Sequence, residues 1–123
     1  MDWIEELPNN CPPSDAKPPD GQTFYRLCQN NPPEGSDFVS LKIENPSRTF
    51  AGVSECQLRA VSIWSDVDKC ASLKKFKTLR DRVIGSITLS NEDGLIKQTN
   101  GPHHYSWWRS THFNPNIAVI VEQ

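Results

Sequence analysis

The sequence predicts an α+β fold, with a single compact domain, a small and mostly antiparallel β core, short helices and a proline-rich N-terminal arm. The chain has 123 residues, which is the length of one ordinary domain. Its short alternating apolar segments are mixed with short helical patterns, without the regular strand–helix alternation of a parallel sheet. Of its ten prolines, five lie between residues 8 and 21.

These five prolines divide the chain into an arm, residues 1–21, and a domain, residues 22–123. Proline removes backbone donors and interrupts helices, so the arm is expected to be extended. Trp3, Ile4 and Leu7 precede the prolines and predict a short apolar helix that the arm holds across the body of the domain.

The first half of the domain contains one predicted strand and two short helices. Residues 22–28 form the strand, which carries Phe24, Tyr25 and Leu27. Residues 36–44 are predicted as a helix that Ser36 caps and that ends before Pro46. Residues 55–59 predict a single helical turn.

The second half begins with a strand over residues 60–64, which places Val61 and Ile63 on one face and Ser62 and Trp64 on the other. A helix follows at once, with Ser65 as its N-cap, an acid three residues later and an apolar stripe that reaches Phe76. Further strands are expected at residues 83–89, 95–99 and 117–121, the second of them after an Asp-Gly turn.

Charge and composition exclude several classes of protein. The formal net charge is −2, and no apolar stretch is long enough for a membrane helix. The first seven residues are too acidic and too short for a secretory signal, so we expect a cytoplasmic protein. The basic residues between 74 and 82 predict the solvated face of a helix, and we do not expect nucleic-acid binding there.

The four cysteines, at positions 11, 28, 56 and 70, are widely separated and form no C-x-x-C pair. We therefore expect no bound metal and, in a reducing compartment, four free thiols. A catalytic thiol has no support from the spacing of the histidines.

Three segments concentrate residues suited to chemistry. Tyr25 and Arg26 lie together in the first strand, where an arginine needs an anion or a neighbouring carboxylate. Ser62 and Trp64 share one strand face, which either forms a site or is covered by the next helix. Residues 101–109 are rich in imidazole and indole; as a strand, they place His104, Ser106 and Trp108 on one face, either in the core or facing a site for a planar or sugar ligand.

A strand bearing Tyr25-Arg26, a strand bearing Ser62-Ile63-Trp64 that runs into a capped helix, and a further strand pair resemble the small bacterial domains of the ADP-ribosyltransferase-like superfamily. That superfamily includes RES-type toxins and RNA 2′-phosphotransferases. The resemblance implies a split β core that binds NAD as substrate in a toxin or defence setting. It implies that Arg26 and Ser62 are catalytic residues and that Tyr25 or Trp64 clamps the nicotinamide.

The chain departs from that family in lacking an E-x-E motif on a late strand. The position expected for the acid falls near His104, so His104 becomes the third candidate catalytic residue. The alternative is a non-catalytic module, such as an accessory or immunity protein. Its protein partner would then dock on a surface formed by Trp107, Trp108 and Arg109, because exposed tryptophan and arginine dominate many interfaces.

Overall fold

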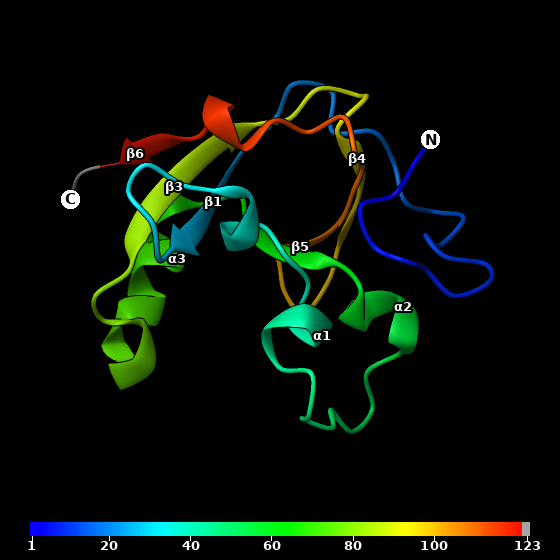
Figure 1. Ribbon diagram of the computed structural model, residues 1–123, viewed down its shortest axis with the longest axis horizontal. Helices are drawn as coiled ribbons and strands as arrows, with labels where there is room; N and C mark the ends of the chain where they lie inside the picture. Colours follow the sequence, from blue (N-terminus) through cyan, green and yellow to red (C-terminus); the bar gives the residue numbers. More distant parts are fainter. Residues whose placement is uncertain (122–123) are drawn as a thin grey trace.

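The computed structural model describes residues 1–121. It contains one six-stranded sheet in the order β4-β5-β2-β1-β3-β6, with every neighbouring pair antiparallel (Figure 1). The strands are β1 (Thr23–Cys28), β2 (Val61–Trp64), β3 (Val83–Thr88), β4 (Gly94–Gln98), β5 (His104–Arg109) and β6 (Val119–Val121). The helices are short: α1 (Leu41–Glu44), α2 (Glu55–Leu58) and α3 (Val67–Ser72). The α+β prediction is confirmed.

One face of the sheet forms the main hydrophobic core. Alternation along each strand directs Phe24, Ile63 and Trp107 to this face, where all three are fully buried. Phe38 and Phe113 come from the connecting segments and pack edge to face with Trp107, at centroid distances of 6.5 and 4.8 Å. The central strands are therefore held by aromatic packing as well as by their hydrogen bonds.

The other face is covered in part by α3, which lies against β1 and β2 (Figure 1). Cys70 packs there against Leu27 and Ile84 in a smaller cluster. The N-cap is Asp66, whose side chain accepts a hydrogen bond from Asp68 N, and not Ser65 as predicted. The α-helix also ends at Ser72, because two 3-10 turns, Leu73–Lys75 and Lys77–Leu79, replace its predicted continuation.

Strands β1 and β2 are joined at a single residue pair, Tyr25 and Trp64. Beyond that pair they separate, whereas β1 pairs with β3 along its whole length, from Thr23 with Thr88 to Cys28 with Val83. This separation in the middle of the sheet creates the opening that the candidate site uses.

Three local predictions are corrected. Residues 36–44 form a 3-10 turn, Gly35–Asp37, and then α1, whose cap is Ser40 rather than Ser36. Residues 1–7 form no helix; Trp3 instead makes an isolated β-bridge with Ser110, because the backbone at the end of β5 bonds the residues on either side of Trp3. The final apolar run begins as a 3-10 turn, Pro115–Ile117, before β6.

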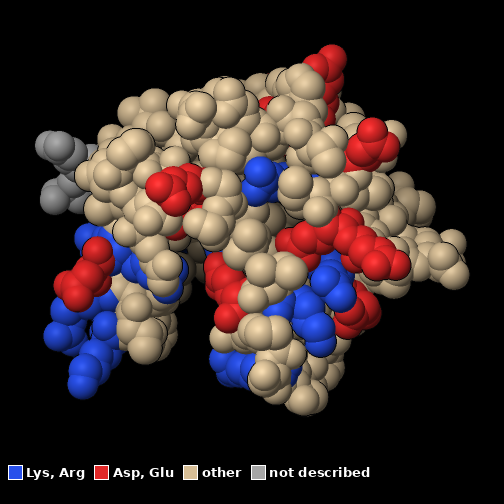
Figure 2. Space-filling model, in the orientation of Figure 1, with Lys and Arg blue, Asp and Glu red and all other residues tan. Residues whose placement is uncertain are grey.

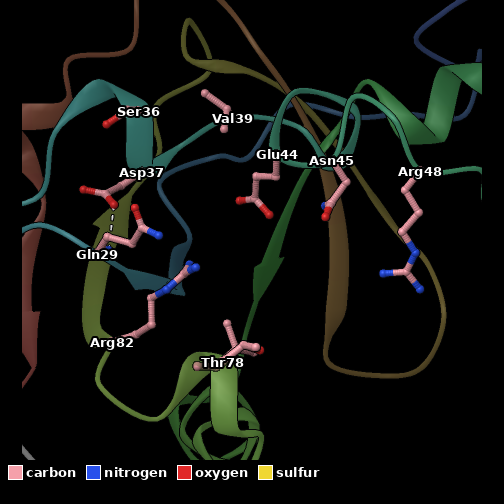
Figure 3. A pocket seen from close by; sticks show the side chains of 10 residues that line it. Gln29, Ser36, Asp37, Val39, Glu44, Asn45, Arg48, Thr78 and Arg82 are labelled. Carbon is pink, nitrogen blue, oxygen red and sulfur yellow. Dashed lines mark hydrogen bonds between the residues drawn. The ribbon is translucent and has the colours of Figure 1, made fainter.

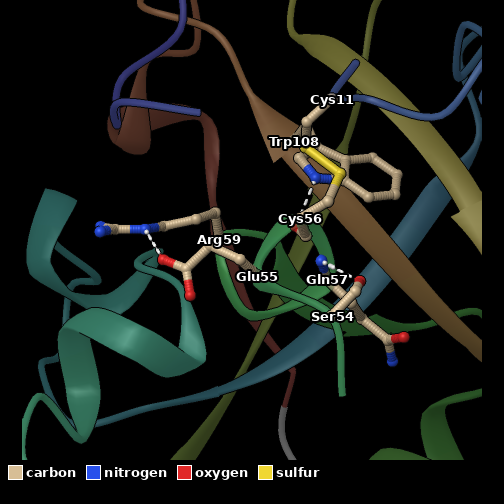
Figure 4. Close-up of a disulfide and its surroundings, with 7 residues drawn as sticks. All are labelled: Cys11, Ser54, Glu55, Cys56, Gln57, Arg59 and Trp108. Atoms are coloured by element: carbon tan, nitrogen blue, oxygen red, sulfur yellow. Dashed lines mark hydrogen bonds and ion pairs between the residues drawn. A yellow bond between two sulfur atoms is a disulfide. The ribbon is translucent and has the colours of Figure 1, made fainter. Parts of the chain in front are cut away.

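A disulfide joins Cys11 to Cys56 across 45 residues and ties the N-terminal segment to α2 (Figure 4). The expectation of four free thiols is therefore wrong, because the fold brings these two distant cysteines to a Cα–Cα distance of 5.6 Å. Trp108 lies beside the bridge and donates its indole N–H to the carbonyl of Cys56 at 2.9 Å. Cys28 and Cys70 remain free and buried, as predicted. Among residues 1–121 no helix is long and apolar enough to cross a bilayer.

Candidate functional site

A cleft separates the 3-10 turns that follow α3 from the segment that contains α1 (Figure 2). It has an inner part of about 250 Å³ and an outer part of about 680 Å³. Glu44, Leu79 and Arg82 line both parts, so the two adjoin. In Figure 2 the hollow opens between two lobes that both carry cationic side chains.

Ser62, Trp64 and His104 come together in the inner part of the cleft. Trp64 and His104 are direct partners across β2 and β5, and their rings meet edge to face at 4.7 Å. Ser62 lies two residues before Trp64 and therefore on the same face. The predicted alternation of both strands is correct here, and it brings these three candidate residues to one surface.

His104 is buried, and its Nδ1 lies 3.0 Å from the carbonyl oxygen of Thr99. A carbonyl can only accept, so this contact assigns the proton of the neutral ring to Nδ1. Within residues 1–121, Nε2 makes no hydrogen bond. Burial lowers the pKa of His104 below its ordinary value, although the bond to Thr99 acts in the opposite direction. A neutral imidazole with a free Nε2 lone pair is suited to accept a proton.

Arg26 also lines the inner part, but its guanidinium is occupied within the protein. Nε donates to the carbonyl of Asp37 at 2.6 Å, Nη1 to that of Ser62 at 2.8 Å and Nη2 to that of Val39 at 3.3 Å. Nη2 also pairs with the carboxylate of Glu44. Arg26 thus spans the gap between the separating strands and bonds one carbonyl of β2 and two carbonyls of the segment before α1.

Tyr25 lies outside the residues that line the cleft. It packs against the cluster of Leu27, Cys70 and Ile84 beneath α3. Trp64, its direct partner across β1 and β2, packs against the same cluster. Of the two aromatic residues considered as a nicotinamide clamp, only Trp64 borders the cleft.

The outer part is polar, and sequence reasoning missed its residues (Figure 3). Arg82 and Thr78 lie on one side, while Glu44, Asn45 and Arg48 lie across the opening. Asp37 closes one end, and its carboxylate accepts hydrogen bonds from Gln29 N at 2.7 Å and Glu34 N at 2.9 Å. Glu44 ends a four-residue helix and Arg82 precedes a strand, so neither position carried a local signal of function.

The surface proposed for a protein partner is absent. Trp107 and Trp108 are 0% and 2% exposed, and Arg109 is 9% exposed. The cause is the place of β5 between β4 and β2, with the main core on one side and the disulfide region on the other. Arg109 instead donates Nη1 to the carbonyls of Gly35 and Phe38, at 3.1 and 3.0 Å.

No group of three or more metal-binding side chains comes together within residues 1–121. Comparison of the chain with family models, with curated proteins and with solved structures finds no match.

Proposed function

We propose that the cleft binds a dinucleotide of the NAD type and that the protein transfers or hydrolyses its ADP-ribosyl group. The observation that carries the proposal is the convergence of Ser62, Trp64 and His104 on one cleft, at the point where β1 and β2 separate. Taken together, the inner part of about 250 Å³ and the outer part of about 680 Å³ fall in the range of small-molecule sites, which is roughly 300–1,000 Å³ for a whole site. The toxin or defence setting rests on the sequence resemblance alone.

The two parts of the cleft suit the two chemical ends of such a ligand. Trp64 and Ser62 line the inner part, and an indole and a hydroxyl match a nicotinamide and its ribose. The outer part offers Arg82 and Arg48, which match the pyrophosphate. We assign the phosphate contacts to these two residues because Arg26, the residue that the resemblance implies, already donates to Asp37, Val39, Ser62 and Glu44.

The proposed chemistry uses two side chains of the cleft, the imidazole of His104 and the carboxylate of Glu44. In hydrolysis the bond between nicotinamide and ribose breaks and nicotinamide leaves with the electron pair. A water oxygen then bonds to the ribose carbon and gives its proton to His104 Nε2. The Glu44 carboxylate lines both parts of the cleft and pairs with Arg26 through Oε1, so its Oε2 would stabilise the positive charge that develops on the ribose. In transfer, an acceptor hydroxyl takes the place of water.

Calorimetric titration of the protein with NAD tests the binding step. We expect wild-type protein to bind, and Arg82→Gln to weaken the affinity by about tenfold, as for loss of one charged phosphate contact. Arg80→Gln is the matched control, since Arg80 is exposed, lies two residues away and does not line the cleft. The absence of binding by wild type, or equal affinities for the two variants, would overturn the proposal.

Release of nicotinamide from NAD tests the chemical step. We expect His104→Gln to lower the rate by at least about a hundredfold and to change the affinity for NAD little, since loss of a general base typically costs that much. A wild-type protein that binds NAD and releases no nicotinamide, in the presence or absence of a protein or nucleic-acid acceptor, would restrict the function to binding.

A further inference from the structure

Residues 69–82, which we call the basic lobe, carry six cationic side chains and one carboxylate, Asp81. The lobe projects from the body of the molecule beside the cleft, and cationic side chains cluster on it in Figure 2. The six are Lys69, Lys74, Lys75, Lys77, Arg80 and Arg82. Within residues 1–121 none of the six forms an ion pair with a carboxylate. The protein as a whole has a net charge of −2, so this concentration of positive charge is local.

An aromatic ring stands in the middle of these charges. Phe76 is 51% exposed, although the sequence predicts it on the buried stripe of a helix. The reason is local: Phe76 adopts extended dihedral angles, with φ −77° and ψ 134°, between two 3-10 turns, which ends the helical periodicity before it. The ammonium of Lys75 lies 5.3 Å from the centre of the Phe76 ring. The lobe therefore presents a flat apolar face flanked by unpaired cations.

Although the sequence alone predicts no nucleic-acid binding here, the exposure of Phe76 changes that expectation. We propose that the basic lobe binds single-stranded nucleic acid, by stacking of an unpaired base on Phe76 and by contacts of the surrounding lysines and Arg80 with phosphates. Every base has a π face, and lysine and arginine follow the phosphate chain. A duplex keeps its bases stacked on one another and cannot use the ring in this way. A membrane surface would need more apolar area than one exposed phenyl group provides.

This surface is distinct from the proposed catalytic cleft, although Arg82 borders both. Thr78 and Leu79 of the lobe form part of the cleft wall. A strand lying across Phe76 would therefore pass the mouth of the cleft. The proposal does not depend on NAD binding, since its ring and its exposed lysines line neither part of the cleft.

The test measures the anisotropy of a fluorescein-labelled 12-nucleotide single strand, DNA or RNA, on titration with the full chain. We expect binding that weakens as salt rises. Phe76→Ala should weaken binding by about tenfold, whereas Val119→Ala, at an exposed apolar residue of β6, should leave it unchanged. Lys75→Glu should weaken binding and lower the salt slope by about 0.7 or more, whereas Lys17→Glu, at an exposed lysine beside β4, should change the affinity much less.

Three outcomes would overturn the proposal: no binding of either strand, equal effects of each variant and its control, or tighter binding to the matched duplex or to anionic vesicles of phosphatidylserine and phosphatidylcholine. His104→Gln separates the two functions, since it should bind the labelled strand as wild type does. If NAD binding fails and strand binding holds, the cleft proposal alone is lost.

Discussion

Arg26 Nη1 donates a hydrogen bond of 2.8 Å to the carbonyl oxygen of Ser62, across the gap where β1 and β2 stop pairing. A side chain thus takes the place of a strand partner. The same guanidinium holds the backbone at Asp37 and Val39, so one residue ties the segment before α1 to two strands of the sheet.

Replacement of Arg26 should therefore destabilise the fold, so a loss of activity in such a variant would not by itself indicate a catalytic role. Arg26→Ala leaves three carbonyls and the Glu44 carboxylate without their donor, and we expect the free energy of unfolding to fall by about 3 kcal/mol. Urea denaturation measures this loss. Arg26→Ala with wild-type stability and no NAD binding would instead indicate that Arg26 contacts the ligand.

The buried ring of His104 should make stability depend on pH. Burial lowers its pKa in the folded protein below the ordinary 6.5, so the unfolded chain binds the proton more readily. Stability should be constant above that value and fall as pH drops from 6.5 toward the lower folded pKa. Urea melts between pH 4.5 and 8 should show this fall in the wild-type protein and not in the His104→Gln variant. Parallel profiles would mean that His104 is exposed in solution.

His112 should have the opposite effect. Its hydrogen bond to Asp93 at 3.1 Å is the main cause that raises its pKa, and the charge of Glu92 adds to it. The stabilisation that this contact provides is fully present below pH 6.5, the ordinary pKa of histidine. It is lost as the pH rises through the higher pKa of the folded protein. Proton NMR titration should show that the pKa of His112 is lower in an Asp93→Asn variant than in the wild-type protein. An unchanged pKa would exclude the contact.

The disulfide can be tested by counting the thiols that react with a thiol reagent. Burial raises the pKa of Cys28 and of Cys70 to about 12, so the folded protein should react slowly with a thiol reagent. After unfolding without reductant we expect two reactive thiols, and after reduction four. Cys11→Ser with Cys56→Ser should lower stability by about 2–4 kcal/mol. Four thiols before reduction in freshly purified protein would support the cytoplasmic expectation, because disulfides persist in oxidising compartments.

Gly94 is required where β4 approaches β5. A Cβ there would lie 2.1 Å from the carbonyl oxygen of Trp108, and the residue has φ +138°. We expect Gly94→Ala to cost more than about 3 kcal/mol in urea melts. Gly101 is the matched control, because its φ is +133° but a Cβ there meets nothing within 4 Å. Gly101→Ala should cost only the backbone strain, about 1–2 kcal/mol.

The sequence predicts most of the strands because alternation depends on local burial, which a strand carries in its own residues. It located Ser62, Trp64 and His104 on outward faces for the same reason. It left open whether Trp107 and Trp108 are buried, because their cover comes from residues as distant as Phe38 and Cys56. It also missed Glu44 and Arg82 as neighbours, because only the three-dimensional path of the chain brings them to one cleft.

The order of the strands has a consequence for synthesis on the ribosome. β1 is made before β3, yet β3 is its fully paired neighbour, so Thr23 must wait for Thr88. At about 5–20 residues per second, the apolar residues of β1 stay unpaired for several seconds while the intervening chain emerges. β4 and β5 alone can close as a local hairpin. The central part of the sheet is therefore expected to form only after β3 has emerged, and the nascent chain should be a substrate for chaperones that hold exposed apolar segments.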